Sequence, residues 1–320
     1  MEKIEFYFNR ELNIDMISET FRKAFKVEFD KEYWCWRFKN NPLGKKIYIN
    51  YILENNTLAA YYAVSPCMVE IEGRGKFKIA LSNMTMTHPD YQGRGYFKKL
   101  ADALFEQLKR DGFIGVFGFA NQNSHYGFKK YLNWKDLSPL NIFKTDQSHF
   151  RSNLIKEDKN YSFEESLVNE ELIAIAANMR FSTNRINIHR DTDILKWRML
   201  TIPNQKYHVL KVTSGNLVYA EVFYKFYKED IDILEYFYSP VIEKESLETL
   251  GICINYFIKK FGKPVNIWSN VHSEEHLYLE KIGFCETNFI TYFGFIPFCD
   301  DKEILDYRNW HYRFMDSDVF

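Results

Sequence analysis

A weak internal duplication constrains the fold of this chain more than any other feature of its sequence. Three short patterns occur twice and in the same order. They are a Trp-Arg pair five residues before a proline, a proline between a strand-like and a helix-like run, and an aromatic residue that closes a polar helical segment. The matched residues are Trp36 and Trp197, Pro89 and Pro240, and Trp134 and Phe284, which lie 161, 151 and 150 residues apart. Ordered repeats indicate a repeated architecture, so we predict two domains that share one order of elements.

Hydrophobic periodicity supports this division. In the first half we expect strands at 4–8, 47–53, 58–64, 79–86, 114–119 and 139–143, and helices at 14–25, 31–39, 95–110 and 124–132. In the second half we expect helices at 192–200 and 245–260, and strands at 207–212, 217–226, 231–238, 265–269 and 310–318. This order of strands and helices predicts an α/β or α+β layered fold for each domain. Residues 145–159 are polar and charged with little periodicity, so we place the domains at 1–148 and 149–320.

Composition and charge argue against several classes of partner. The 320 residues are 46% hydrophobic, which is enough for two cores. With 42 basic and 43 acidic residues the net charge is −1, so we expect neither nucleic acid nor an anionic membrane as a partner. No apolar run reaches the length of a membrane span, and the N-terminus lacks a signal-peptide core. The five cysteines include no Cys-x-x-Cys pair, which favours free thiols in a reducing compartment. We therefore expect a soluble, cytoplasmic monomer or homodimer that binds no metal.

The segment from Thr87 to Tyr96 reads Thr-His-Pro-Asp-Tyr-Gln-Gly-Arg-Gly-Tyr and lies between a strand-like run and a strong helical pattern. Backbone N–H groups in the first turn of a helix have no intrahelical partner, and the helix dipole adds positive potential there. Gly93 and Gly95 allow a tight turn and a close approach of the backbone to a ligand. The segment therefore predicts a phosphate-binding loop.

The order Gln92-x-x-Gly95 resembles the acyl-CoA pyrophosphate loop of the GNAT acetyltransferase superfamily, and the order of elements resembles two tandem GNAT-like domains. The resemblance implies that each domain has a mixed, mostly antiparallel sheet flanked by helices. The resemblance implies acetyl-CoA or another acyl-CoA as co-substrate. It places the pantetheine arm along Thr85, Met86 and Thr87, and the pyrophosphate on the backbone of Gln92, Gly93, Arg94, Gly95, Tyr96 and Phe97. It also assigns Asn121, Ser124 and Phe128, which follow the next strand, to the cofactor site. Phe97 departs from the family's Gly or Ala, so its side chain is expected to point away from the ligand.

The proton-transfer groups are left open by the sequence. Many members of the family place a tyrosine in the helix after the asparagine as general acid for the departing thiolate, whose reference pKa is about 8.5. Counting along this chain puts no tyrosine at that position, and the nearby candidates are Tyr126 and Tyr131. His125 and His88 are candidates for the general base that takes the proton of the attacking amine. Residues 310–318 end in the carboxylates of Asp316 and Asp318, and these or the chain terminus at Phe320 are further candidates, since some members of the family use a terminal carboxylate as base.

The second half lacks the loop. Aligned on Pro240, it has Glu243-Lys244-Glu245-Ser246 where the first half has Gln92 to Gly95. The glycines are absent, and two carboxylates would repel a pyrophosphate. We therefore expect the second half not to bind CoA and to form a wall of the acceptor site.

These observations favour transfer of an acyl group, most simply acetyl, from CoA to a primary amine of a small molecule or an amino sugar. One alternative is a Fem-type aminoacyl transferase, which uses aminoacyl-tRNA. The intact glycine loop and the near-neutral charge disfavour it. Another alternative is a non-catalytic CoA-binding or scaffold protein, which the unmatched tyrosine position would favour.

Overall fold

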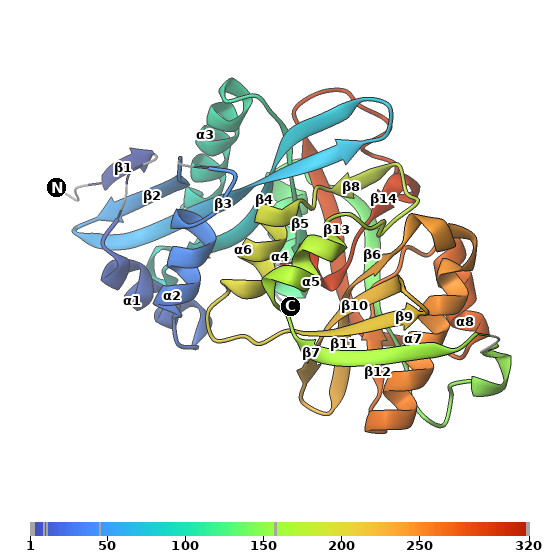
Figure 1. Ribbon diagram of the computed structural model, residues 1–320. Helices are drawn as coiled ribbons and strands as arrows, with labels where there is room; N and C mark the ends of the chain where they lie inside the picture. The colour runs from blue at the N-terminus through green and yellow to red at the C-terminus, as the bar shows by residue number, and fades with distance from the viewer. Residues whose placement is uncertain (1–3, 9, 11, 45, 157–158, 318–320) are drawn as a thin grey trace. The chain divides into compact units, whose positions relative to one another are not determined.

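The computed structural model describes residues 4–317 except 9, 11, 45, 157 and 158 (Figure 1). The chain forms two compact units. The first contains Met1–Pro139 and Tyr292–Leu305, and the second contains Leu140–Thr291 and Asp306–Phe320. From the sequence we predicted one boundary, between residues 148 and 149. In the structure the chain leaves the first unit nine residues earlier, and a segment near its end returns to it.

The first unit is built on a sheet with strand order β1-β2-β3-β4-β5-β13. The strands are β1 (Ile4–Phe8), β2 (Tyr48–Glu54), β3 (Thr57–Ile71), β4 (Gly75–Thr87), β5 (Phe113–Ala120) and the end of β13 (Cys285–Pro297). Neighbouring strands are antiparallel except β4 and β5, which are parallel. Five of the six strands predicted for the first half are therefore present here, and the sixth, at 139–143, belongs to β6 (Lys135–Thr145), which pairs with β12 (Val265–Ile267). β3 ends later and β4 begins earlier than predicted, so the two form a long hairpin.

Helices cover both faces of this sheet. They are α1 (Ile14–Phe25), α2 (Lys31–Trp34) with a π-helical continuation (Cys35–Lys39), α3 (Tyr96–Arg110) and α4 (Gln122–Tyr131). Adjacent tyrosines of β3 show the two faces, because neighbouring side chains of a strand point in opposite directions. Tyr61 packs with Ile17 and Trp34 from α1 and α2, whereas Tyr62 packs with Leu104 from α3.

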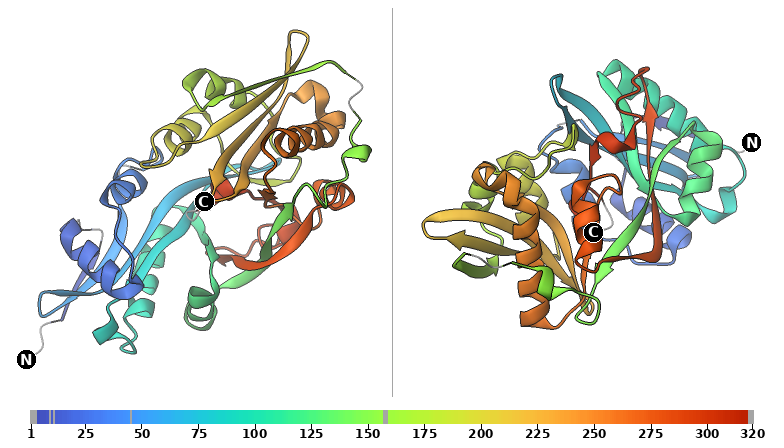
Figure 2. Two further views of the ribbon diagram at one scale, coloured as in Figure 1. Left: turned by 90° about the horizontal axis from the view of Figure 1, so that it is seen from below. Right: turned by 90° about the vertical axis from the view of Figure 1, so that its right-hand side faces the viewer.

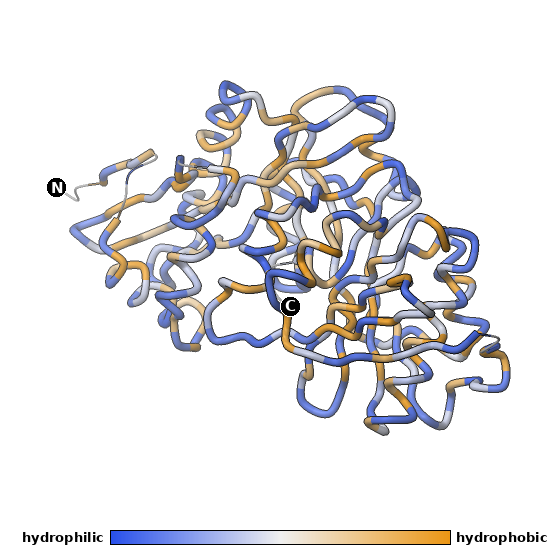
Figure 3. Tube along the Cα trace, in the orientation of Figure 1, coloured by the Kyte–Doolittle hydropathy of each residue, from blue (hydrophilic) through white to orange (hydrophobic). Residues whose placement is uncertain are grey.

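The second unit repeats this plan with strand order β6-β12-β11-β10-β9-β7. Its strands are β6 (Lys135–Thr145), β7 (Tyr161–Leu167), β9 (His208–Ser214), β10 (Leu217–Tyr227), β11 (Asp230–Tyr238) and β12 (Val265–Ile267). Its helices are α5 (Glu170–Ala176), α6 (Thr192–Leu200), α7 (Ser246–Phe261) and α8 (Glu274–Lys281). β11 and β12 are parallel, as β4 and β5 are. Hydrophobic stretches recur along both strands and helices (Figure 3), and the core of this unit joins β10, β11 and β12 to α7, which lies along one face of the sheet (Figure 2). Among the described residues, no helix is long and apolar enough to cross a membrane.

The last strand of the first unit comes from the far end of the chain. β13 starts in the second unit, and its residues from Tyr292 to Pro297 pair antiparallel with β5. The fit is tight, since a Cβ on Gly294 would lie 2.1 Å from the Trp134 ring. Gly115 of β5 has equally little space, because its Cβ would lie 2.2 Å from the Phe295 ring.

The prediction of a last strand at 310–318 was wrong. Only Trp310–His311 forms a two-residue strand, β14, which pairs with β8 (Ile186–Ile188). The chain then turns through a 3-10 segment at Phe314–Asp316, whose three residues are buried. The alternation of aromatic and polar residues there reflects burial on several sides, because the polar residues of this segment form internal ion pairs.

Glu221 is a buried carboxyl in the middle of β10. It is fully buried, it faces Lys211 and Phe237 in the neighbouring strands, and neither carboxyl oxygen has a hydrogen-bond partner in the described part of the chain. Burial raises its pKa from 4.5 to about 8, although Lys211 partly opposes this and Glu171 adds to it. At neutral pH the folded protein therefore binds a proton at Glu221 that the unfolded chain has released.

We expect this proton to make folding stability fall with rising pH. Between the unfolded pKa and the folded pKa, stability should decrease by about 1.4 kcal/mol per pH unit. Glu221→Gln should remove this slope, so the variant should be more stable than the wild type at pH 7, by a margin that grows from pH 5 to pH 8. Urea unfolding at several pH values measures the free energy of unfolding of each protein. Glu248→Gln is the control, because Glu248 is exposed. Parallel stability curves for Glu221→Gln and the wild type would contradict the assignment.

Candidate functional site

The parallel strands of the first unit separate partway along their length. The ladder between β4 and β5 runs from Lys78 and Phe113 to Leu81 and Phe117. β4 continues beyond this point with β3 as its partner, as far as Thr87 opposite Ala60. The backbone of Thr85, Met86 and Thr87 therefore lies past the ladder on the β5 side, where an extended ligand could pair with it.

A β-bulge marks the place where the strands separate. The register of β3 and β4 shifts between Ala63 and Val64, which leaves Asn83 as the extra residue of β4. The Asn83 side-chain oxygen accepts hydrogen bonds from the Ser65 N–H, at 3.0 Å, and from the Ser65 hydroxyl. Its Nδ2 is buried without a hydrogen-bond partner in the described chain. A buried polar donor of this kind requires a partner that the protein does not itself provide.

The loop after β4 has the geometry of an anion site. A 3-10 turn at Pro89–Tyr91 leads to Gly93 and Gly95, whose φ angles are +78° and +73°. Gly95 caps α3, and the first backbone bond of this helix joins the Lys99 N–H to the Gly95 carbonyl at 3.2 Å. The N–H groups before Lys99 consequently have no partner inside the helix.

A cavity of about 270 Å³ lies over this loop, lined by Thr87, Tyr91, Gln92, Gly93, Arg94, Gly95, Tyr96, Phe97, Lys98 and Tyr131. A Cβ on Gly93 or Gly95 would meet no atom within 4 Å, so the glycines border open space rather than protein. The loop thus fits a phosphate group that approaches the backbone closely.

Side chains anchor the loop from beneath. Glu54 at the end of β2 is buried, accepts a hydrogen bond from the Tyr96 hydroxyl at 2.6 Å and forms an ion pair with Arg94. Burial, followed by the hydrogen bond to Glu54, raises the pKa of Tyr96. The Arg94 guanidinium also lies 5.0 Å from the centre of the Tyr91 ring. The side chains of Arg94 and Tyr96 therefore have structural partners, and their backbone amides are the parts available to a ligand.

Two predicted cofactor residues pack into the core. The Phe97 ring lies 5.6 Å from Phe128 and 6.0 Å from Tyr62, so much of its bulk is directed into the unit. Phe128 also packs against Trp134, at 5.1 Å, and does not line the loop cavity. The sequence does not show that these two residues belong to the core, because an aromatic residue near a motif can lie in the core or in a ligand site.

Asn121 and Ser124 form the cap of α4. The Asn121 side-chain oxygen accepts hydrogen bonds from the backbone N–H groups of Asn123 and Ser124, both at 3.0 Å, and from the Ser124 hydroxyl at 3.2 Å. This is the ordinary chemistry of a helix N-cap. This cap fixes the start of α4 directly after β5, at the end of the sheet where β4 and β5 are no longer paired.

The two candidate tyrosines lie apart. Tyr126 is 64% exposed, and its hydroxyl accepts a hydrogen bond from Lys130 at 2.8 Å. Tyr131 is half-exposed and lines the loop cavity beside Gly93 and Gly95. Tyr131 is therefore placed at the phosphate end of the site, whereas a general acid for the thiolate would be needed at the other end.

His125 is the predicted catalytic residue with the most defined surroundings. Its Nε2 lies 2.6 Å from a carboxyl oxygen of Asp136, at the start of β6, and its ring stacks on Tyr292 with centroids 3.8 Å apart. Burial raises the pKa of Asp136, but the hydrogen bonds from Lys129 and His125 outweigh it and leave the pKa below its usual value. The carboxylate thus stays ionised and orients the imidazole.

The remaining base candidates are less suited. His88 is buried and accepts a hydrogen bond from the Asp90 N–H at 3.2 Å, which makes it a cap for the 3-10 turn. Of the C-terminal carboxylates, Asp316 is buried in an ion pair with Arg190 at 2.9 Å, so it is not a free base. The carboxylates at Asp318 and Phe320 lie outside the described residues.

The counterpart of the loop in the second unit has a different structure. A 3-10 segment at Pro240–Glu245 runs directly into α7, without a glycine turn. Glu243 and Glu245 form ion pairs with Arg180 and Lys159. The carboxylates expected from the sequence are thus in place where the first unit presents free amides.

Comparison with known proteins identifies the first unit's fold. The family model described as an acetyltransferase (GNAT) domain matches residues 10–135. This part of the chain is a GNAT domain. A comparison with curated proteins found no match.

Solved structures extend the likeness to both units. A probable N-acyltransferase from Enterococcus faecalis V583 has a TM-score of 0.69 at 12% identity, over 93% of this chain and 73% of that one. A tandem GNAT protein from the clavulanic acid biosynthesis pathway has a TM-score of 0.60 at 9% identity, over 93% of this chain and 100% of that one. Saccharomyces cerevisiae N-myristoyltransferase with bound myristoyl-CoA has a TM-score of 0.61 at 10% identity, over 92% and 79%. At these identities the likeness shows the fold, which is that of tandem GNAT domains.

The two loops give a matched pair of variants for acetyl-CoA binding. Gly93→Asp adds a carboxylate and a Cβ to the open cradle, and we expect it to abolish stabilisation by acetyl-CoA. In the wild type, ligand at about 100 times its Kd should add roughly 2.7 kcal/mol. Lys244→Asp at the aligned position of the second unit should leave this gain intact. Thermal unfolding with and without acetyl-CoA measures the gain in stability for both variants, and each variant is compared with its own ligand-free protein. Equal losses would show that both loops bind CoA.

Proposed function

We propose that this protein is an acyl-CoA-dependent N-acyltransferase that transfers acetyl to a primary amine of a small molecule or an amino sugar. The observation that carries the proposal is the continuous path in the first unit, from the unpaired edge of β4 to the open glycine loop at the start of α3. A long, thin ligand with a pyrophosphate in its middle matches such a path. The neighbouring structures described as a probable N-acyltransferase and as an N-myristoyltransferase with bound myristoyl-CoA support this choice.

Distinct parts of the first unit would hold distinct parts of the ligand. The amides of Gly93 to Phe97 would bind the pyrophosphate, and the backbone of Thr85 to Thr87 would pair with the pantetheine amides. The thioester would supply an activated acyl carbon for attack by an amine. Asn83, whose Nδ2 lacks a partner at the bulge in the described chain, is available as a donor near the separation of the strands.

The amine must lose a proton to complete the reaction. We assign this task to His125, because Asp136 orients its imidazole and because Nδ1 has no hydrogen-bond partner in the described chain. A histidine held by a carboxylate is a common arrangement for a general base. Tyr126 and Tyr131 are less suited as general acids, since one is exposed and the other lies beside the pyrophosphate loop.

The direct test is a search for turnover. The full-length protein is incubated with acetyl-CoA and a library of primary amines that includes amino sugars, and released CoA is followed with a thiol reagent. We expect CoA release that depends on one class of amine. Stabilisation by acetyl-CoA without release across the library would favour a CoA-binding scaffold, and stabilisation by no acyl-CoA would overturn the proposal.

Once an acceptor is found, His125→Gln tests the base. We expect kcat to fall by about 100-fold or more, the low end of what general acid–base catalysis contributes, while acetyl-CoA binding stays unchanged. His149→Gln is the matched control, because His149 forms a similar pair with Asp146, at 2.8 Å, on the surface of the second unit. An unchanged kcat in His125→Gln would remove this histidine from the mechanism.

A further inference from the structure

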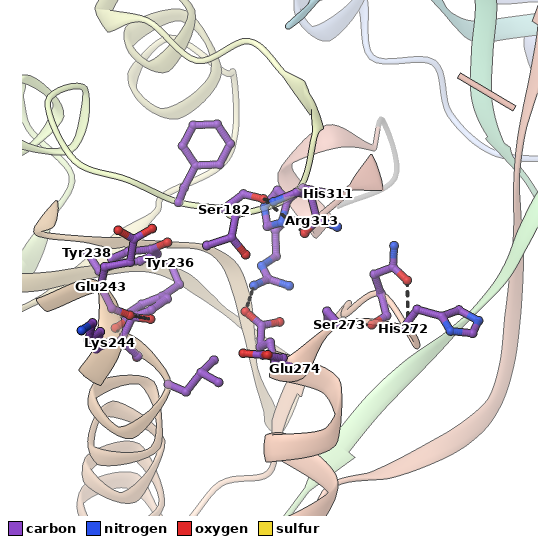
Figure 4. A pocket seen from close by; sticks show the side chains of 17 residues that line it. Ser182, Tyr236, Tyr238, Glu243, Lys244, His272, Ser273, Glu274, His311 and Arg313 are labelled. Carbon is purple, nitrogen blue, oxygen red and sulfur yellow. Dashed lines mark hydrogen bonds and ion pairs between the residues drawn. The ribbon is translucent and has the colours of Figure 1, made fainter. Parts of the chain in front are cut away.

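The second unit has a cavity of its own at the position that corresponds to the cofactor site. It encloses about 410 Å³ between the end of β11, the start of α7 and the start of α8, with further walls from residues 181–184 and from β14 (Figure 4). In the first unit the equivalent elements are β4, α3 and α4. The volume lies in the roughly 300–1,000 Å³ range of small-molecule sites.

The charged groups at the base of this cavity already have partners. Arg313 is buried, forms an ion pair with Glu275 and donates to the Trp268 carbonyl. Glu235 below it pairs with Arg190 at 2.7 Å and with His311 at 3.3 Å. The nearby guanidinium groups and the hydrogen bond with His311 keep the pKa of Glu235 at about 2, even though burial, the largest influence, raises it. A ligand with a strong net charge would find no uncompensated counter-charge among these described groups at the base.

The mouth of the cavity is also unfavourable for an anion. Glu243, which is paired with Arg180, lies in the 3-10 segment that leads into α7, and the exposed Glu274 lies in the first turn of α8. Lys244 is the one exposed lysine among the described residues that line the cavity. The negative groups occupy the positions that would otherwise attract phosphate.

Two polar atoms of the cavity wall have no partner in the part of the chain that the structure describes. The Tyr238 hydroxyl makes no hydrogen bond there, although Tyr238 is only 4% exposed. Burial, together with Glu243, raises the pKa of Tyr238 to about 12, so this hydroxyl keeps its proton. The Nδ1 atom of His311, which is 6% exposed, likewise has no hydrogen-bond partner within the described residues. Polar atoms that line a cavity are normally satisfied by what occupies it.

Aromatic rings form the apolar part of the wall. Tyr236 and Tyr238 are stacked at 5.6 Å, and the Tyr236 hydroxyl donates to the Ser246 carbonyl at 2.7 Å, which holds the start of α7. The Phe181 ring lies 5.6 Å from His311 and 4.3 Å from the Arg190 guanidinium carbon. Phe181 and Tyr236 thus offer rigid flat surfaces between polar groups.

We propose that this cavity binds a neutral, hydroxyl-rich small molecule of monosaccharide size rather than acyl-CoA. A hydroxyl group both donates and accepts, so it can satisfy the Tyr238 hydroxyl, the His311 nitrogen and the spare lone pairs of the carboxylates. The C–H face of a sugar ring or cyclitol would lie on the aromatic wall. This proposal does not depend on whether the first unit transfers acyl groups.

Tyr238→Phe tests the proposal, because it removes only the unpartnered hydroxyl. The full-length protein is titrated with glucose, galactose, mannose and myo-inositol, and binding is followed by saturation-transfer NMR and by the resonances of labelled histidine side chains. We expect at least one of these probes to bind and to shift the His311 signals. Tyr238→Phe should weaken that binding about 3- to 10-fold, as the loss of one neutral hydrogen bond does.

Matched controls separate this cavity from the loop of the first unit. Tyr227→Phe, at a half-exposed tyrosine of the same unit outside the cavity, should leave binding unchanged, and so should Gly93→Asp. The proposal is overturned if none of the four probes binds or if Tyr238→Phe does not alter binding. It is equally overturned if glucose 6-phosphate binds more tightly than glucose, or if acetyl-CoA displaces the sugar in Gly93→Asp.

Discussion

The pairing of β13 with β5 is the interaction on which the first unit depends. It supplies the neighbour that β5 needs along its second edge, and it brings Tyr292 against the His125 ring. It also inserts Gly294 against Trp134, with no space for a side chain. The GNAT domain and the base assigned to it are therefore complete only with residues that follow almost the whole second unit in the sequence. A shortened chain that ends near residue 148 would lack one strand of its own sheet.

Duplication followed by divergence explains how one fold presents two different cavities. In both units a parallel pair of strands ends beside the first turn of a helix. In the first unit, glycines leave the amides of this turn open to an anion. In the second unit, Glu243 lies in the 3-10 segment before this turn, and the base of the cavity is filled by internally paired charges. The arrangement of the elements is shared by the two units, while the charges around the two cavities differ.

Much of this organisation could be predicted from the sequence, because it rests on local patterns. The repeated Trp-Arg pair marks two buried arginines, Arg37 and Arg198, and each donates to a tyrosine hydroxyl, at 3.1 and 2.9 Å. The glycine loop and the order of elements were likewise predicted, and the GNAT fold is confirmed. The return of β13 could not be predicted, since strand partners distant in sequence leave no local signal. The cavity around Tyr238 was also missed. Its aromatic residues cannot be told from core residues by sequence, because only the structure shows which hydroxyl groups have hydrogen-bond partners.

The position of β13 has a consequence for synthesis. About 170 residues separate Ala120 from its partner Tyr292. At translation rates of roughly 5–20 residues per second, the edge of β5 would wait on the order of 10–30 s for its last neighbour. An unpaired strand edge is a template for association with other chains. The ribosome-bound chain would pass through a window in which the nascent GNAT domain is vulnerable to aggregation, and the rate of translation across the second unit would set its length.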